Sequence, residues 1–278
     1  MSRLLSVLIP AHNEAAYIGT CLATLFASDP LPQGWRVEVL VLANGCQDDT
    51  ATRARRIAPP RGWSLRVLEQ DKGNKTAALT VGDAAAAGDI LVYLDADVRP
   101  EPALLAQIVA ALASDAPLYA SGRPRISRAR SAITRAYASA WQELPFWHVG
   151  VPGFGLFAMT RAGRARWQDW PDIISDDAFA RLHFTPGERL LLPARYDWPM
   201  VEGFRNLVRV RRRQDRGAAE VNRLYPDLAQ NDDHRPLTLP GLGRIARRRP
   251  LGLLVYIAVA LAVRTPLFAT RETWVRGR

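Results

Sequence analysis

The sequence contains little cysteine, almost no lysine and no hydrophobic run long enough to cross a membrane. Its two cysteines, Cys21 and Cys46, have no CxxC spacing and no further cysteines with which to form a disulfide framework. The apolar run Leu4–Ile9 is ended by Pro10 and Glu14 before it could serve as the core of a secretory signal. We therefore expect reduced thiols and a cytoplasmic chain.

The longest uncharged apolar stretch is Leu251–Val263. As a helix it would be about 20 Å long at ~1.5 Å per residue, whereas a hydrocarbon core is about 30 Å thick. The remaining composition, 48% hydrophobic and 23% charged over 278 residues, excludes disorder, collagen and coiled coil. A chain of this size can bury one large α/β core or two small ones.

Positive charge is concentrated in the last part of the chain. Residues 201–278 contain 16 basic and 7 acidic side chains, whereas residues 1–200 contain 21 and 20. This asymmetry predicts a polyanionic partner for the tail, either a nucleic acid or an anionic membrane surface. No recognised nucleic-acid-binding module accompanies the charge, so we expect no nucleic acid.

The first hundred residues alternate between strand-like and helix-like hydrophobic patterns. The expected strands are Leu5–Ile9, Val37–Leu42, Ser64–Leu68 and Asp89–Leu94, and the expected helices are one capped by Asn13, Asp49–Ile57 and Thr76–Ala87. This alternation predicts βαβ units and a mixed, mainly parallel sheet, with ligands beyond the carboxyl ends of the strands. Farther on we expect a helix over Ile126–Trp141, a strand over Phe154–Met159 and a short helix over Ser175–Phe184.

Two acids follow the most apolar of these strands, in the DxD motif Asp95-Ala96-Asp97. In extended backbone both side chains point to the same side, and a divalent cation such as Mg²⁺ would relieve their repulsion while also binding substrate phosphates. The alternative is a strand-end turn with two solvated acids.

Both lysines of the chain, Lys72 and Lys75, lie in the loop before the third expected helix, and every other basic side chain is Arg. A lysine beside a glycine loop and a helix N-terminus suits a phosphate or nucleotide contact. A solvated helix start is the alternative.

These segments together resemble family 2 glycosyltransferases with the GT-A fold. The resemblance is carried, in order, by Pro10-Ala11-His12-Asn13-Glu14, Asn44–Thr50, Lys72-Gly73-Asn74-Lys75-Thr76, Asp95-Ala96-Asp97-Val98, Gly153–Arg161 and Ser175-Asp176-Asp177. It covers roughly residues 4–215. It implies a GT-A domain over 1–215, with a nucleotide-binding half (1–98) and an acceptor half (99–215), followed by a basic segment over 216–278.

The resemblance also implies the role of each site residue. The nucleotide-binding residues would be Pro10, Ala11, Asn13, Glu14, Asn44, Lys72, Lys75 and Asp95. Asp97, with Asp95, would bind Mg²⁺ or Mn²⁺; Asp177 would be the general base beside Asp176; and Gly153, Phe154, Gly155 and Trp147 would contact the acceptor. For the acid pair 176–177, the alternative is a pair of helix N-terminal acids favoured by the helix dipole.

The implied activity is inverting transfer of one sugar from a nucleotide-diphosphate sugar to a cell-surface glycan or a lipid-linked acceptor. Processive relatives carry a Gln-x-x-Arg-Trp signature, whereas this chain has Gln214-Asp215-Arg216-Gly217, without the Trp. Two other functions stay open: a haloacid-dehalogenase-like phosphohydrolase using Asp95-Ala96-Asp97-Val98, and an inactive membrane-surface scaffold.

The basic tail has two interpretations. Arg244, Arg247, Arg248 and Arg249, followed by Leu251–Val263, resemble a helix that lies in a membrane interface, which would place the protein on the inner face of the plasma membrane. The alternative is a core-packing helix with solvated arginines. The arginines at 205, 209, 211, 212, 213 and 216 could bind the donor diphosphate or face the bilayer.

Overall fold

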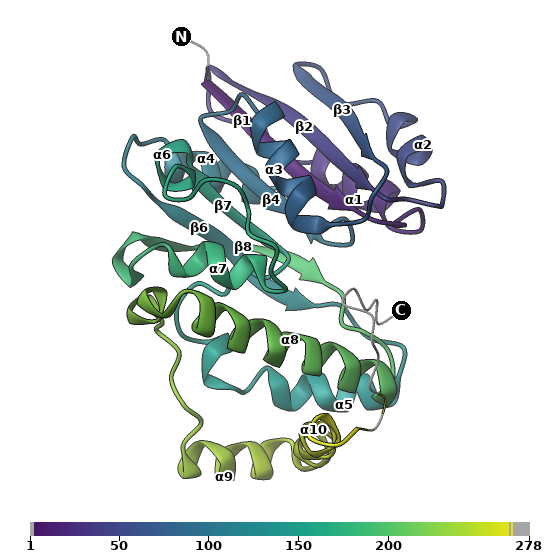
Figure 1. Ribbon diagram of the computed structural model, residues 1–278, viewed down its shortest axis with the longest axis vertical. Coiled ribbons are helices and arrows are strands. Elements are labelled where there is room, and N and C mark those ends of the chain that lie inside the picture. Colours follow the sequence, from purple (N-terminus) through teal and green to yellow (C-terminus); the bar gives the residue numbers. More distant parts are fainter. Residues whose placement is uncertain (1–2, 267, 269–278) are drawn as a thin grey trace. The chain divides into compact units, whose positions relative to one another are not determined.

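The computed structural model describes residues 3–266 and 268 (Figure 1). The chain forms two compact units, each made of segments that are separate in the sequence. The first unit comprises residues 1–125, 153–172 and 176–198, and the second comprises residues 126–152, 173–175 and 199–278, in both cases as far as the structure describes them.

The first unit contains one mixed sheet in the order β3-β2-β1-β4-β7-β6-β8-β5. Its strands are β1 (Arg3–Ala11), β2 (Trp35–Asn44), β3 (Trp63–Gln70), β4 (Ile90–Leu94), β5 (Arg99–Pro100), β6 (Tyr119–Ile126), β7 (Leu156–Thr160) and β8 (Arg189–Trp198). The first four strands are parallel, and β7 pairs antiparallel with both β4 and β6. The expected α/β fold with a mixed sheet is confirmed.

Helices cover both faces of this sheet. They are α1 (Ile18–Phe26), α2 (Thr50–Arg55), α3 (Lys75–Ala85), α4 (Leu104–Leu112), α6 (Arg161–Arg164) and α7 (Asp176–Leu182). Odd-numbered side chains of β1, such as Val7, form a core with α1 and α4. Leu8 and Leu42 point to the other face, where Gly82 of α3 packs so closely that an added Cβ would lie 2.8 Å from Leu8 and 2.6 Å from Leu42. The two faces follow from the alternation of side chains along a strand.

Two expected elements differ from the structure. Asn13 does not cap α1, which begins at Ile18, because the intervening residues form a turn. The predicted helix over Ile126–Trp141 begins only at Ala132, where Ser131 caps it by accepting a hydrogen bond from Thr134. The preceding residues, 119–126, form β6, a strand that the sequence analysis did not predict. Its first four residues are buried, and Tyr119 and Ala120 pair with β7.

The second unit is helical. It contains α5 (Ala132–Trp141), α8 (Phe204–Leu224), α9 (Leu239–Arg248) and α10 (Pro250–Val263), with 3₁₀ turns at Pro145–Trp147 and Pro226–Asn231; a third 3₁₀ turn, Pro186–Glu188, belongs to the first unit. The boundary expected between residues 215 and 216 falls inside α8, so the structure divides the chain elsewhere. None of the helices in the described part of the chain is both long and apolar enough to cross a membrane.

Two arginines expected to face a diphosphate or a bilayer have structural partners in this unit. Arg211 donates to Asp215 (2.7 Å) and to the hydroxyl of Tyr256 in α10 (3.3 Å). Arg212 donates to the last two carbonyls of α10, those of Ala262 (3.1 Å) and Val263 (3.2 Å), and to that of Thr265 just beyond the helix (2.8 Å). These bonds satisfy carbonyls that a helix end leaves without partners, so both arginines hold α8 against α10. The final part of the predicted basic segment, residues 267 and 269–278, lies outside the described residues.

Candidate active site

Four loops meet at the carboxyl edge of the parallel strands β1, β2, β3 and β4. They are residues 12–17, 45–49, 71–74 and 95–98. In a parallel sheet the carboxyl ends of neighbouring strands lie side by side, and this is where ligands bind in α/β folds. The loops hold most of the residues for which the sequence predicted nucleotide or metal binding.

The first two loops are joined by hydrogen bonds. His12 Nδ1 donates to the carbonyl of Asn44 (2.6 Å), and the Asn44 amide donates to the carbonyl of Ala11 (3.0 Å). The side-chain oxygen of Asn13 accepts from the backbone of Gln47 (2.6 Å). Asn13 has a positive φ of 51°, a conformation that Asn tolerates better than most residues. The amide group of Asn44, expected near the base, therefore contributes to the loop framework.

The second and third loops are packed backbone to backbone. Gly45 has φ +58°, and a Cβ there would lie 2.3 Å from the backbone nitrogen of Gly73. Its own N–H donates to the carbonyl of Gln70 at the end of β3 (2.7 Å). This close approach fixes the loop that carries the two lysines. Lys72 is exposed, whereas Lys75 begins α3 and is half-buried.

Lys75 connects two of the acidic motifs. Its Nζ lies 3.1 Å from Asp95 Oδ1 and 2.9 Å from Asp176 Oδ2. The Lys75 side chain is 18% exposed, that of Asp176 is 7% exposed and that of Asp95 is 37% exposed. The end of β4 and the start of α7 are thus tied to the start of α3, although the three residues are far apart in the sequence.

The ion pairs change the titration of this cluster. Burial alone would lower the pKa of Lys75, but the carboxylates of Asp176 and Asp95 more than offset it and the pKa is raised. Burial raises the pKa of Asp177, the adjacent Asp176 raises it further, and the Lys75 ammonium partly offsets both effects. The pKa of the Asp177 carboxyl is therefore above its ordinary value, and its role as general base stays a prediction.

The expectation of extended backbone through Asp95 and Asp97 is wrong. The N–H of Val98 donates to the carbonyl of Asp95 (3.0 Å), which closes a turn, and β4 ends at Leu94. Asp is favoured at the first position of such turns. The convergence of the two carboxylates cannot be argued from strand geometry, and metal binding by Asp95 and Asp97 stays a prediction.

The chemistry of the donor set still suits Mg²⁺ or Mn²⁺. Asp95 and Asp97 are both half-buried at the edge where a nucleotide would bind. Mg²⁺ is held in many enzymes by one or two carboxylates, with substrate phosphates and waters completing the octahedron. Lys75 contacts Asp95 through Oδ1, so Asp95 and Asp97 together still offer carboxylate oxygens that could hold a cation.

The predicted acceptor segment adjoins the same turn. Asp95 N–H donates to the carbonyl of Gly155 (2.9 Å). Gly155 has φ +77°, and a Cβ there would lie 2.7 Å from the Trp198 ring. Phe154 packs edge-on against Trp198 with ring centroids 5.1 Å apart. Gly153 also has a positive φ (+70°), so this segment follows a path that side chains disfavour.

The remaining acceptor candidate, Trp147, belongs to the second unit. Its ring packs against Trp141, with centroids 5.1 Å apart, and against Phe146, at 6.2 Å. Trp141 itself is buried. Trp147 is therefore part of an aromatic cluster of the second unit, and its contact with an acceptor stays a prediction.

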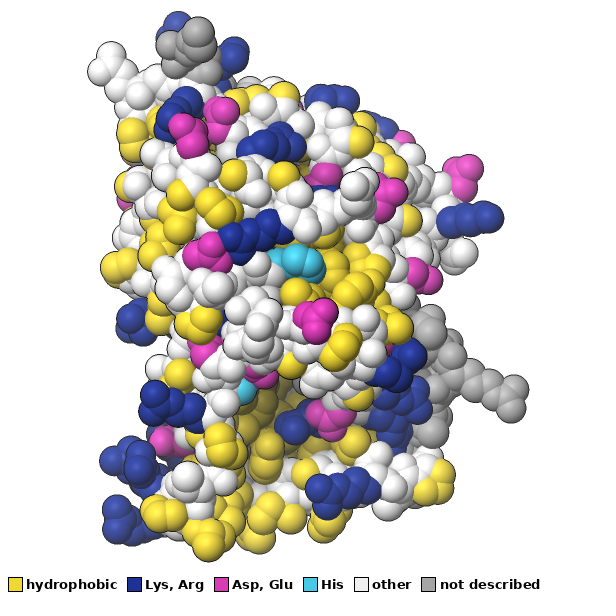
Figure 2. All heavy atoms as spheres, turned by 60° about the vertical axis from the view of Figure 1, so that its left-hand side comes forward, with side chains coloured by type: hydrophobic (Ala, Val, Ile, Leu, Met, Phe, Trp, Pro, Cys, Tyr) yellow, Lys and Arg dark blue, Asp and Glu magenta, His cyan; other side chains and the backbone are white. Residues whose placement is uncertain are grey.

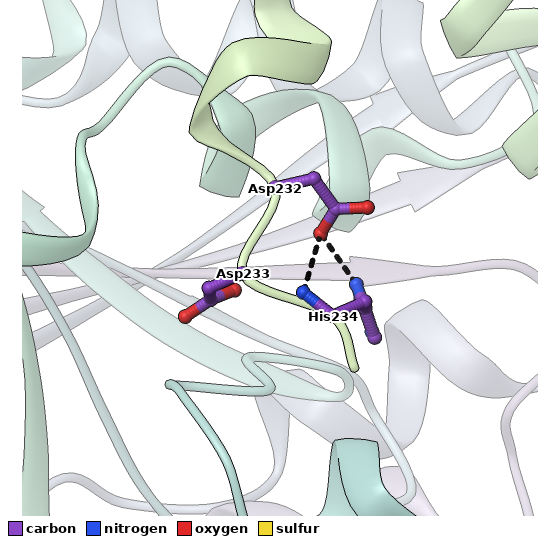
Figure 3. Close-up of side chains that lie close together, drawn as sticks. All are labelled: Asp232, Asp233 and His234. Carbon is purple, nitrogen blue, oxygen red and sulfur yellow. Dashed lines mark hydrogen bonds and ion pairs between the residues drawn. The ribbon is translucent and has the colours of Figure 1, made fainter. Parts of the chain in front are cut away.

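The sequence analysis did not identify one acidic group. Asp232, Asp233 and His234 are the sole group of three or more His, Cys, Asp or Glu in residues 3–266 and 268 whose ligand atoms lie within 4.8 Å of one another (Figure 3). His234 Nδ1 lies 2.5 Å from Asp232 Oδ1. The group is largely exposed in the loop after α8 and belongs to the second unit. The sequence signal was the occurrence of two Asp and one His at consecutive positions. This signal is weak, because exposed acidic groups are common without a bound ion.

Comparison with known proteins gives relatives over part of the chain. Glycosyltransferase AglE of Haloferax volcanii is 36% identical over 95 residues, which are 34% of this chain and 31% of that protein. The undecaprenyl-phosphate 4-deoxy-4-formamido-L-arabinose transferase of Aeromonas hydrophila is 32% identical over 111 residues, 39% of this chain and 33% of that protein. The chain thus spans about a third of the length of these curated relatives.

Solved structures share the fold over most of the chain. The mannosyltransferase PcManGT from Pyrobaculum calidifontis, solved with GDP-Man and Mn²⁺, has a TM-score of 0.59 at 24% identity, covering 94% of this chain and 81% of that one. S. aureus TarS 1-349 has a TM-score of 0.56 at 15% identity, covering 91% and 72%. These likenesses establish the GT-A fold.

A family model described as Glycosyl transferase family 2 matches residues 6–175. This range contains all four loops at the carboxyl edge and the segment from Gly153 to Gly155, and it ends just before Asp176. The matched residues make up more than half of the chain, and the chain therefore belongs to glycosyl transferase family 2.

Proposed function

We propose that this protein transfers a single sugar, with inversion, from a nucleotide-diphosphate sugar to a lipid-linked or cell-surface glycan acceptor. The observation that carries the proposal is the ion pairing of Lys75 with both Asp95 and Asp176. It joins the predicted donor-binding edge of the sheet to the predicted acceptor base in one cluster.

The donor would lie over the four loops. Pro10, Ala11, Asn13, Glu14, Asn44, Lys72 and Lys75 are the residues proposed to line or approach the nucleotide. Asp95 and Asp97 would hold Mg²⁺ or Mn²⁺, which supplies Lewis-acid neutralisation of the leaving diphosphate when bound. Lys75, which lies beside Asp95 and Asp176, would offer its ammonium group to the diphosphate.

Asp177 is proposed as the general base that takes the proton of the acceptor hydroxyl. Its raised pKa supports this role, because a base is most effective when its pKa approaches the working pH. Asp176 would anchor the start of α7 through Lys75, leaving Asp177 to face the acceptor. Removal of the acceptor proton by one carboxylate base is what a one-step displacement with inversion would require.

The acceptor would approach along Gly153, Phe154 and Gly155, whose backbone adjoins Asp95. A lipid-linked acceptor is supported by relatives named for transfer to undecaprenyl phosphate and for dodecaprenyl-phosphate galacturonate synthesis. Such an acceptor would bring the protein to the inner face of the plasma membrane and to cell-envelope synthesis.

Membership of family 2 argues against the phosphohydrolase alternative. The inactive scaffold is the remaining competitor, and it is tested by the same experiment as the transferase.

The experiment compares wild type with Asp177→Asn. Donor binding is measured as the shift in thermal midpoint on adding UDP- or GDP-sugars with Mn²⁺, since a ligand stabilises the fold by mass action. Turnover is measured as nucleotide diphosphate released in the presence of a polyprenyl-phosphate acceptor. We expect Asp177→Asn to lose roughly 10²–10⁴-fold in turnover with an unchanged donor shift. Equal losses of binding and turnover would make Asp177 a binding residue, and absence of any donor shift in wild type would support the scaffold.

A further inference from the structure

Helices α9 and α10 of the second unit leave a row of large apolar side chains in solvent. We call this row the α9–α10 face; it consists of Leu239 (83% exposed), Leu251 (72%), Leu254 (64%), Leu261 (56%) and Ile257 (42%). The four members on α10 are spaced three or four residues apart and so lie along one side of that helix. Isolated exposed leucines are ordinary, but several large apolar side chains exposed along one side of a helix favour an interaction surface.

Arginines border the α9–α10 face. Arg244, Arg247, Arg248 and Arg249 lie in the last turns of α9 and at its junction with α10, and all four are exposed. Arg248 and Arg249 lie 3.8 and 3.5 Å from Glu143, so one carboxylate is shared between two guanidinium groups. Figure 2 shows hydrophobic and basic side chains gathered at the lower edge of the view, where α9 and α10 lie.

The opposite side of α10 is fixed to its own unit. A Cβ on Gly252 would lie 2.6 Å from the carbonyl of Ala136 in α5, so the two helices are in close backbone contact. Leu253, Val259 and Ala262 are buried, and Arg212 binds the carbonyls at the end of the helix. Both the start and the end of α10 are therefore held by the second unit, and the helix presents its exposed side along its whole length.

The occupant of this face is identified by its chemistry. A protein partner of unknown sequence would need no particular charge, whereas an anionic bilayer offers both an apolar layer for the leucines and phosphate headgroups for the arginines. Each basic residue near an anionic bilayer adds to the electrostatic attraction, and burial of the apolar face in the bilayer adds to the binding free energy. We propose that the α9–α10 face docks on the surface of an anionic lipid bilayer, with α10 lying in the plane of the interface.

This inference rests on the proposed function only for the choice of a membrane-borne acceptor. The docking itself needs neither donor nor metal. It is therefore measured without them, and its failure would leave the transferase proposal untouched.

The test is flotation of the full-length protein with vesicles at 0.15 M salt. One set is pure phosphatidylcholine and the other contains 30 mol% phosphatidylglycerol, a composition chosen for the assay (about one lipid in three anionic). We expect binding to the anionic vesicles and at least roughly tenfold weaker binding to the neutral ones. Equal binding to both, or no binding to either, would overturn the proposal.

Two variants assign the binding to this face. Leu254→Ser/Leu261→Ser removes exposed apolar area and should weaken binding by about tenfold or more. Val81→Ser, an exposed residue (42%) of the first unit, is its matched control and should bind as wild type does. Because all three side chains are exposed, each variant should retain the wild-type circular dichroism spectrum. If the leucine variant bound as tightly as wild type, the face would not be the docking surface.

The second variant tests charge. Arg244→Glu/Arg247→Glu should abolish the preference for anionic vesicles, whereas Arg36→Glu/Arg61→Glu, at exposed positions of the first unit, should keep it. Sedimentation velocity without vesicles checks the competing occupant, a second copy of the chain. A dimer that Leu254→Ser/Leu261→Ser dissociates would show that the face mediates self-association, and would overturn membrane docking.

Discussion

Replacing Lys75 by Met should destabilise the first unit by about 3 kcal/mol. Met keeps most of the apolar stem of the side chain and removes the ammonium, so Asp176, 7% exposed, loses a partner at 2.9 Å. Removing one member of a buried pair typically costs about 3–5 kcal/mol, because the other charge stays desolvated. The lower end applies here, since the second partner, Asp95, is 37% exposed and water screens that interaction.

The pH window of this effect follows from the direction of the shift. The pKa of Lys75 is raised by its two carboxylate partners, so the folded state binds the proton more tightly than the unfolded state does. The stabilisation is complete below the ordinary lysine pKa of 10.5 and is lost as the pH rises through the raised value. A measurement at pH 7.5 therefore reports the full contribution.

Urea unfolding followed by tryptophan fluorescence measures the loss, without nucleotide or metal. The chain supplies its own control, because Lys72→Met removes the only other lysine, three residues away and exposed. We expect the control to stay within about 0.5 kcal/mol of wild type. If both variants lowered the free energy of unfolding equally, or neither did, the ion pairs of Lys75 would not hold the site together.

Three further predictions concern Asp177 and Gly45. Because the pKa of Asp177 is raised, kcat/KM should fall as the pH drops through that value, above the ordinary 3.8; a profile without an acid limb would contradict its role as base. Because the pKa of Asp177 is higher in the folded protein than in the unfolded chain, ionisation of this carboxylate destabilises the fold. Asp177→Asn should therefore raise the thermal midpoint at pH 8 and not at pH 3. Gly45→Ala should cost about 2 kcal/mol or more in urea unfolding, because φ is +58° and the added Cβ meets backbone at 2.3 Å. Gly34→Ala, at φ +88° with nothing within 4 Å, controls for φ alone and should cost about half as much; equal losses would show that the contact does not matter.

Strong local patterns account for the elements that sequence analysis placed correctly. Ile90–Leu94 is a continuous apolar run and is fully buried, and the run from Leu251 to Val263 forms α10. The antiparallel strand β8 was not anticipated, because its ten residues alternate between buried and exposed only in part and include Pro193. Helix α8 was recognised only as an Arg-rich segment, since its hydrophobic positions are few among seven arginines.

Sequence analysis predicted which motifs make up the candidate site, but not how their side chains contact one another. The rarity of lysine drew attention to Lys75, but its contact with Asp176 joins residues 101 positions apart, and no local pattern encodes such a distance. The backbone expected to be extended at Asp95 forms a turn, which the hydrogen bond from the Val98 N–H to the Asp95 carbonyl closes. The close packing of Gly45 is likewise invisible in the sequence, where it is one glycine among nineteen.

The sequence by itself determined the class of fold, the order of the acidic and lysine motifs and the separation of charge between the two parts of the chain. The periodicity of hydrophobic residues, the glycine-containing loops and the composition can be read from the sequence without knowing which residues are in contact. Only the tertiary structure decided that Lys75 pairs with Asp95 after β4 and with Asp176 at the start of α7. It also decided that Arg211 and Arg212 hold α10, and that Leu251, Leu254 and Leu261 remain in solvent. Those outcomes depend on which chain segments come into contact. The free energy of such a contact depends on both of the distant residues that make it, and not on any one stretch of sequence.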